Sequence, residues 1–260
     1  MISKIVKLGS EIDVKKRVII FLVGAILLVT SLPLSTKMVM ELVHEQNMNL
    51  KYNITNVSKG SPPTESKLNF KGHIVEIEET IKDIESYIDP WSNKIGIADL
   101  SVKIDGEEID ILKDYPIKVE EVGLNRYYGE IAYLTVEDKK NDKVQFIVLL
   151  KKTRELQKEL PNGDIVGWVP LEKLKYTLYT LDEEGILNNI SFGFMERDAL
   201  QTELLNSGVV VPHSIGYYTD ALEGYPSIFF PLIYPFGTSI IGLILIIVFF
   251  PIRRNKSLRT

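Results

Sequence analysis

The sequence predicts an α+β protein in which two transmembrane helices, one near each terminus, flank a domain with a mainly antiparallel sheet and two or three helices. Val18–Thr36 and Gly224–Ile252 contain no charged residue. Each stretch is long enough to cross a hydrocarbon core about 30 Å thick, which takes about 20 helical residues. Between them, segments rich in alternating apolar residues are separated by turn dipeptides, the pattern of antiparallel strands.

Charge is unevenly distributed along the chain. The tails at 1–17 and 253–260 hold nine basic and two acidic residues, which leaves 21 basic and 33 acidic residues between the two apolar stretches. Lys and Arg near the ends of a span favour the cytoplasmic side. We therefore expect a multi-pass protein of the cell membrane with both termini cytoplasmic and an extracytoplasmic middle. The acidic middle also argues against nucleic acid as a partner, since phosphate backbones bind basic surfaces.

These changes in composition predict one domain between the spans, because the intervening length suits a single core. In chain order, the predicted parts are a cytoplasmic tail (1–17), transmembrane helix 1 (18–36), a membrane-proximal helix and linker (37–66), the extracytoplasmic α+β domain (67–223), a proline-containing transmembrane helix 2 (224–252) and a basic cytoplasmic tail (253–260). An alternative for 18–36 is a cleaved signal peptide. The apolar run that continues through Leu34 favours a retained anchor.

The second apolar stretch contains Pro226, Pro231 and Pro235, whereas Phe236–Phe250 is free of proline. Proline removes a backbone donor and clashes with the preceding helical turn. A straight helix is therefore expected from about Phe236, preceded by a kinked segment that begins near Ile228. Two interpretations stay open: an ordinary anchor, or a hinge at Pro231 and Pro235 that passes signals between the domain and the C-terminal tail.

Aromatic and small residues predict how this stretch is held. Amphipathic tyrosine rings favour the headgroup region, and four tyrosines cluster at the outer boundary: Tyr217, Tyr218, Tyr225 and Tyr234. Thr238 and Gly242 form a small-xxx-small pair, which we expect to pack against Gly24 and Ala25 of the first span.

Turn dipeptides divide the middle of the chain into elements. Asn53–Thr64 is polar and rich in turn residues, which predicts a linker. Asp105-Gly106 is suited to a tight hairpin, because both residues tolerate positive φ. The predicted strands are Leu68–Phe70, Ile74–Ile77, Ile95–Ile104, Glu108–Leu112, Tyr127–Val136, Val144–Leu150, Val166–Val169 and Leu174–Thr180.

Helical spacing of apolar residues predicts two helices in the domain. Thr80–Ile88 places Ile81, Ile84 and Ile88 on one face of a short amphipathic helix. Met195–Asn206 is predicted to be a longer helix, with Gly208 beyond its end. Its buried face would hold Met195, Ala199, Leu200, Leu204 and Leu205.

No catalytic residue, cofactor-binding residue or metal ligand is predicted. The three histidines, His44, His73 and His213, lack the paired spacing of a zinc site. Ser214 beside His213 is only a chain neighbour. The chain contains no cysteine, so disulfides, thiol catalysis, Cys-ligated zinc and iron–sulfur clusters are excluded.

Other polar groups have ordinary interpretations. Two acidic clusters, Glu76/Glu78/Glu79 and Asp182/Glu183/Glu184, suit solvated strands and turns, with weak calcium binding as the alternative. Three asparagines match the glycosylation acceptor pattern, Asn53, Asn56 and Asn189.

These observations favour a non-enzymatic integral membrane protein, embedded in the lipid bilayer, whose extracytoplasmic domain binds or scaffolds another envelope or membrane protein. One alternative is a membrane-surface hydrolase, for which His213 or a buried carboxylate would be the general base.

Another alternative comes from a resemblance. The layout of one span at each end around an exported middle, with Pro226, Pro231 and Pro235 before the second span, resembles the polysaccharide co-polymerases. That resemblance implies regulation of chain length in surface-glycan export. It covers the topology and about ten residues, and the predicted hairpins differ from the long outer helices of that family.

Overall fold

The computed structural model describes residues 14–57, 66–88, 92–153, 158–159, 165–166, 170–211, 213–219 and 229–250. The chain divides into two compact units. One comprises Met1–Glu45 and Gly216–Thr260, which we call the helix unit, and the other comprises Gln46–Ile215, which we call the domain.

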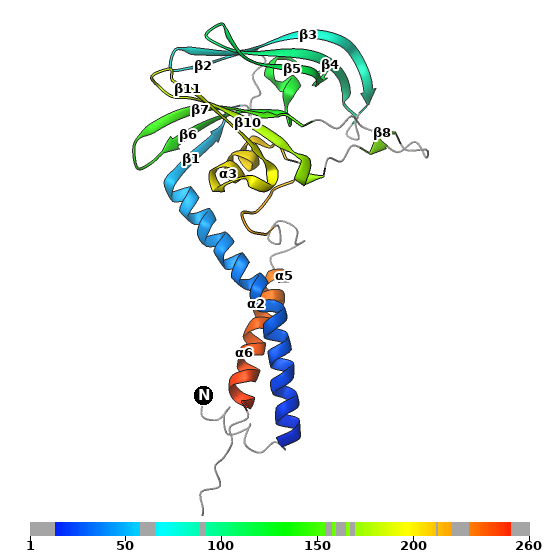
Figure 1. Ribbon diagram of the computed structural model, residues 1–260, viewed down its shortest axis with the longest axis vertical. Coiled ribbons are helices and arrows are strands. Elements are labelled where there is room, and N and C mark those ends of the chain that lie inside the picture. Colours follow the sequence, from blue (N-terminus) through cyan, green and yellow to red (C-terminus); the bar gives the residue numbers. More distant parts are fainter. Residues whose placement is uncertain are drawn as a thin grey trace, which may run out of the picture. The chain divides into compact units, whose positions relative to one another are not determined.

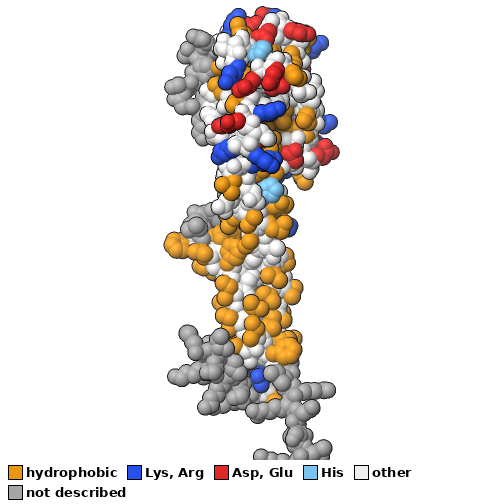
Figure 2. Space-filling view, turned by 90° about the vertical axis from the view of Figure 1, so that its left-hand side faces the viewer, with side chains coloured by type: hydrophobic (Ala, Val, Ile, Leu, Met, Phe, Trp, Pro, Cys, Tyr) orange, Lys and Arg blue, Asp and Glu red, His pale blue; other side chains and the backbone are white. Residues whose placement is uncertain are grey.

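The helix unit contains two helices that are long and apolar enough to cross a membrane, as predicted. The first is α2 (Val14–Lys51), of 38 residues, whose last residues belong to the domain. The second runs through Phe229–Phe249, 21 residues, as α5 (Phe229–Pro231), η4 (Leu232–Gly237) and α6 (Thr238–Phe249). Their length and composition alone indicate that these helices could span a membrane. Hydrophobic side chains cover most of the visible described surface of this unit (Figure 2).

The predicted kink is present in the second helix. The backbone is non-helical at Tyr234, with φ −133° and ψ 124°, between Pro231 and Pro235. The regular helix α6 begins at Thr238, two residues after the predicted start at Phe236. Ile228, the predicted beginning of the span, lies outside the described residues, as do Tyr225 and Pro226.

The two helices approach each other closely at a glycine pair, Gly24 and Gly242. A Cβ added to Gly24 would lie 3.0 Å from the carbonyl oxygen of Gly242, and one added to Gly242 would lie 2.9 Å from that of Gly24. Missing side chains therefore let the two backbones touch, as small residues do in membrane helix pairs. This confirms the predicted packing of Gly242 against Gly24.

The domain is built from antiparallel sheets, which confirms the predicted class (Figure 1). In the described part of the chain, the first sheet has five strands in the order β1-β6-β7-β10-β11 and the second has four in the order β2-β3-β4-β5. The first comprises β1 (Tyr52–Asn56), β6 (Ile131–Asp138), β7 (Lys143–Lys151), β10 (Lys175–Leu181) and β11 (Leu187–Gly193). The second comprises β2 (Lys67–Phe70), β3 (His73–Ile88), β4 (Lys94–Ile104) and β5 (Glu107–Lys118).

Smaller elements complete the domain. Strands β8 (Lys158–Glu159) and β9 (Ile165–Val166) pair with each other. Three short 3₁₀ turns are η1 (Gly123–Tyr127), η2 (Leu171–Lys173) and η3 (Phe194–Glu196). The helix α3 (Ala199–Gly208) follows η3. The predicted hairpin between β4 and β5 is confirmed, with φ 52° at Asp105 and 81° at Gly106.

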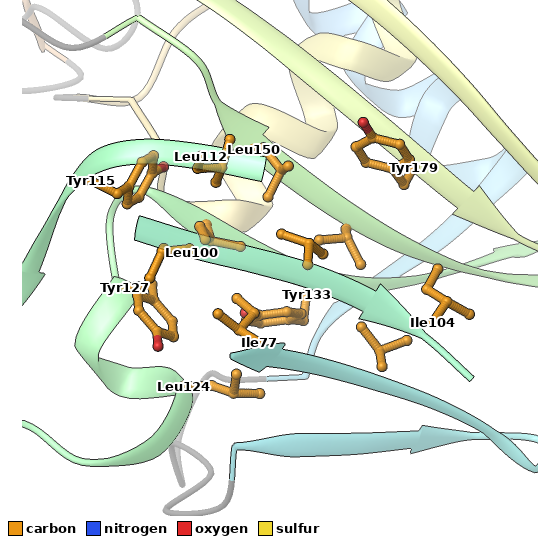
Figure 3. Packing of buried hydrophobic residues seen from close by; sticks show 14 of the residues in the cluster. Ile77, Leu100, Ile104, Leu112, Tyr115, Leu124, Tyr127, Tyr133, Leu150 and Tyr179 are labelled. Carbon is orange, nitrogen blue, oxygen red and sulfur yellow. The ribbon is translucent and has the colours of Figure 1, made fainter. Parts of the chain in front are cut away.

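The core occupies both faces of the five-stranded sheet. Side chains of the two sheets meet in one apolar layer, where Tyr133 of β6 lies near Ile77 of β3 (Figure 3). The opposite face of the five-stranded sheet packs against α3 through Leu134, Leu149 and Leu204. Strands β6 and β7 are buried on both faces, so Ile131–Val136 and Phe146–Leu150 are nearly continuous apolar runs in the sequence, whereas β10 includes the buried Thr177.

The segment Thr80–Ile88 is strand and not the predicted helix. It forms the second half of β3, with Ile81 opposite Ala98 and Ile88 opposite Lys94. Register shifts between Ile81 and Tyr87 interrupt the two-residue alternation of the strand, so the isoleucines acquire spacing that imitates a helix. Gly96 permits this irregularity, since a Cβ there would lie 2.7 Å from the backbone oxygens of Asp83 and Ile84.

The chain also differs from the prediction at the start of the domain. Part of the predicted linker, Asn53–Asn56, lies in β1, which pairs with β6 over five residues. The five-stranded sheet therefore includes residues upstream of position 67, where the sequence predicted the domain to begin.

Helix α3 confirms the predicted buried face at Leu204 and Leu205 and in part at Ala199 and Leu200, which are half-buried. Leu204 and Leu205 are buried, but Met195 is 65% exposed and lies in η3, before the helix. The helix begins after Asp198, whose side chain accepts from the backbone of Gln201 while the Gln201 side chain accepts from the backbone of Asp198. This capping box was the sequence signal for the true start.

Replacing Leu204 should therefore have a much larger effect than replacing Met195. We expect Leu204→Ala to lower the free energy of unfolding by about 2–5 kcal/mol, because it opens a cavity between α3 and the sheet. Met195→Ala should change it by less than about 0.5 kcal/mol. Chemical denaturation of the two variants measures the difference, and similar losses would mean that α3 packs through another face.

Candidate functional site

The least expected polar group of the helix unit is Glu41 of α2, whose side chain is only 4% exposed. Its carboxylate accepts hydrogen bonds from three successive backbone amides, those of Tyr217, Tyr218 (2.7 Å) and Thr219 (3.2 Å). Successive amides that point at one anion form a nest, which supplies partial positive charge without a basic side chain. We call Glu41 together with Gly216–Thr219 the Glu41 clasp.

Gly216 lets the backbone come close enough to make this clasp. A Cβ at Gly216 would lie 2.7 Å from a carboxylate oxygen of Glu41 and 2.2 Å from the carbonyl oxygen of Thr219. Both distances are too short for any side chain. The clasp therefore ties α2 to the first residues that follow the domain in the chain, within the helix unit.

The His44 ring packs beside the clasp. The His44 ring lies 4.7 Å from the Tyr217 ring, and its Nδ1 is 3.0 Å from the hydroxyl of Tyr218. Tyr234 donates to the carbonyl oxygen of Thr30 at 3.3 Å. Three of the four tyrosines predicted to cluster at the outer boundary thus contact α2: Tyr217, Tyr218 and Tyr234. The fourth, Tyr225, lies outside the described residues.

A cluster of three serine hydroxyls lies in the contact between α2 and α6. The Ser239 Oγ is 2.8 Å from the Oγ of Ser31 and 2.8 Å from that of Ser35, and all three side chains are buried. Ser31 also donates to the carbonyl oxygen of Leu27 at 2.6 Å. Hydroxyls that bond across helices hold membrane helix pairs together. These hydrogen bonds have a structural role, because they fix the register of α6 against α2.

Sequence reasoning missed Glu41 and the serine cluster. One acidic residue among apolar ones was visible between Val39 and Val43. Nothing in the sequence identified its partner, because Glu41 and Tyr217 are 176 residues apart.

The structure does not assemble the three histidines into a site. His44 belongs to the helix unit, and His73 and His213 belong to the domain. His73 Nδ1 lies 2.7 Å from an Asp105 carboxylate oxygen, and this hydrogen bond lowers the pKa of Asp105. Both side chains are partly exposed at a hairpin. His213 and Ser214 are exposed neighbours in the chain.

The acidic clusters are divided among ion pairs and turns. Glu76 pairs with Lys67 at 2.6 Å and Glu78 with Lys103 at 2.6 Å, whereas Glu79 pairs with Arg126. A carboxylate oxygen of Asp182 accepts from the amides of Glu184 and Ile186, and Glu183 lies 3.3 Å from Lys71. Within the described residues, no group of three or more His, Asp or Glu side chains is arranged to hold a metal ion.

A polar hollow of about 270 Å³ lies beside β1 in the domain, lined by Met48, Asn49, Tyr52, Asn53, Ile54, Lys139, Glu203 and Ser207. Its polar groups bond to neighbouring protein atoms: Lys139 donates to the carbonyl oxygen of Asn49 at 2.7 Å, and Asn53 donates to Glu137 at 3.0 Å. Two predicted glycosylation acceptors, Asn53 and Asn56, lie on β1, and Asn56 donates to the carbonyl oxygen of Ser207.

Two strands of the domain each expose more than one apolar side chain. The second half of β3 exposes the predicted helix-face residues, with Ile84 at 65% and Ile81 and Ile88 above 40%. We call these three the β3 isoleucines. The second strand is β11, at the edge of the five-stranded sheet, where Leu187 and Ile190 are exposed. Acidic and basic side chains are interspersed over the face of the domain that Figure 2 shows.

No family model matches this chain, and no similar curated protein or solved structure was found.

Proposed function

We propose that this chain is a non-enzymatic integral protein of the cell membrane, with both termini cytoplasmic, whose extracytoplasmic domain binds another envelope or membrane protein. Two apolar helices of spanning length support the membrane anchorage. The basic tails and the acidic middle support the orientation. The Glu41 clasp supports a fixed connection between α2 and the chain that leaves the domain.

The observation that carries the binding proposal is the exposure of the β3 isoleucines. These apolar residues do not contribute to the hydrophobic core, because their side chains are exposed to solvent. Strand β2 pairs only with the first residues of β3, His73–Glu76. The remainder of β3 carries Glu78, Lys82 and Asp83 and has register shifts. Charges and bulges resist the addition of another strand.

A partner at this position would therefore bind through side chains. Apolar residues clustered on a surface and surrounded by charges mark protein–protein contacts. A partner anchored in the same bilayer, with its own apolar patch, would remain close to the β3 isoleucines at low concentration.

Co-purification of the full chain in mild detergent tests the binding. We expect the partner to be recovered with the wild type and reduced at least tenfold with Ile84→Lys. Ile111→Lys is the matched control, because Ile111 is 50% exposed on β5 of the same sheet. If no protein is recovered with the wild type, or equal amounts are recovered with both variants, the β3 isoleucines are not the binding surface.

Labelling of introduced cysteines tests the orientation. The native chain has no cysteine, so Ser3→Cys, Asn141→Cys and Ser257→Cys each provide a single thiol. An impermeant reagent should label only Asn141→Cys in intact cells and all three after lysis. Labelling of Ser3→Cys or Ser257→Cys in intact cells would contradict the proposed topology.

A further inference from the structure

Strand β11 is an open edge of the five-stranded sheet. It pairs with β10 over seven residues, and no strand pairs with its other side in the described part of the chain. About half of its backbone amides and carbonyls therefore point away from the sheet. Most of its side chains are exposed as well, with Ile190 at 54%.

The other sheet edges carry features that discourage strand pairing. The β5 edge contains Pro116 together with acidic and basic residues, and β2 is four residues long with Lys67 in an ion pair. Beside the β1 edge, Asn56 bonds to the last turn of α3. Strand β11 has none of these features: the whole run from Ile186 to Met195 contains no charge and no proline.

We propose that β11 is a self-association surface, where the β11 strands of two copies of this chain pair antiparallel about a two-fold axis. Such pairing would join two five-stranded sheets edge to edge and satisfy the open backbone groups of both copies. With Ile190 opposite its own copy, Asn189 faces Ser191 of the other chain. Apolar then meets apolar and polar meets polar at the centre.

The distribution of charge favours pairing of two copies at the β11 edge. Residues between the spans have 33 acids against 21 bases, so two domains repel each other over most approaches. An uncharged strand is a place where two identical acidic domains can meet without like charges facing each other. Anchorage in one bilayer would further raise the effective concentration of two copies.

This pairing is separate from the partner proposed for the β3 isoleucines, and either can be wrong alone. Asn189 matches the glycosylation acceptor pattern and lies in the middle of β11. A glycan there would block the edge. Its presence would appear as a mass increase that Ser191→Ala removes, and that result would overturn self-pairing.

The absence of cysteine gives a direct test in the full chain. Ile190→Cys in native membranes should form a covalent dimer with copper oxidant or a short bis-maleimide, because directly opposed Cβ atoms lie about 4.5–5.5 Å apart. We expect at least tenfold more dimer than from Ile111→Cys or Ile84→Cys. Equal cross-linking of the three variants would overturn the proposal.

A second measurement does not depend on cross-linking geometry. The wild type in mild detergent should have twice the protein mass of one 29.6 kDa chain, and Ile190→Lys should have the mass of one chain. Ile84→Lys should leave the doubled mass unchanged. A monomeric wild type, or an Ile190→Lys variant that remains dimeric with an unchanged melting temperature, would mean that β11 does not join two copies.

Discussion

A soluble fragment that begins at Lys67 is expected to lose cooperative folding, whereas the fragment Gln46–Ile215 should fold without the apolar helices. The difference is strand β1, which pairs with β6 over five residues and packs Tyr52 and Ile54 against the α3 side of the core. Without it, the apolar strand β6 becomes an exposed edge, which favours aggregation. Circular dichroism and denaturant titration of the two fragments measure the effect.

Single substitutions in β1 separate lost packing from chain shortening. In Gln46–Ile215, Ile54→Ala should reduce stability measurably, because Ile54 is partly buried against the core. Thr55→Ala should have little effect, because Thr55 is exposed. If the fragment from Lys67 unfolds at the same denaturant concentration as the longer one, β1 contributes nothing to the fold.

Glu41→Ala is expected to destabilise the helix unit by about 1–3 kcal/mol, the usual cost of leaving hydrogen-bond donors without their acceptor. The substitution leaves the amides of Tyr217, Tyr218 and Thr219 without their acceptor. Apparent melting of the full chain in detergent and limited proteolysis at Gly216–Thr219 measure the loss. Both should report release of this segment from α2.

Glu45→Ala is the matched control, since Glu45 is exposed one helical turn after Glu41. Its removal should change the melting temperature little. Glu41→Gln should give an intermediate loss, because the amide retains one acceptor oxygen but not the charge. Equal effects of Glu41→Ala and Glu45→Ala would mean that the clasp does not hold the segment.

Local patterns in the sequence were enough to identify the two apolar helices, the kink before α6 and the hairpin at Asp105-Gly106. Each depends on hydropathy, proline geometry or turn preference over a few residues. Alternation and turn signals likewise predicted most strands of the two sheets. The contact of Gly242 with Gly24 could be predicted because small residues let two membrane helices approach closely.

Where local and long-range preferences compete, the sequence misled. The β3 isoleucines have helical spacing in the sequence, but this segment forms a strand because it pairs with β4. Register shifts in that pairing interrupt the usual two-residue alternation of a strand. Asn53–Asn56 has the composition of a linker, yet β6 recruits it into a sheet. Neighbouring residues carry no information about such partners, which lie tens of residues away in the chain.

By itself, then, the sequence determined an α+β chain with two apolar helices, basic tails and an acidic middle without cysteine. Only the tertiary structure decided which groups meet: the Glu41 clasp, the serine cluster of α2 and α6, the β3 isoleucines in solvent and β11 at a sheet edge. The physical reason is that hydropathy and turn chemistry act over a few residues. Whether a carboxylate is buried, or a strand edge is open, depends on whether residues far away in the sequence pack beside it.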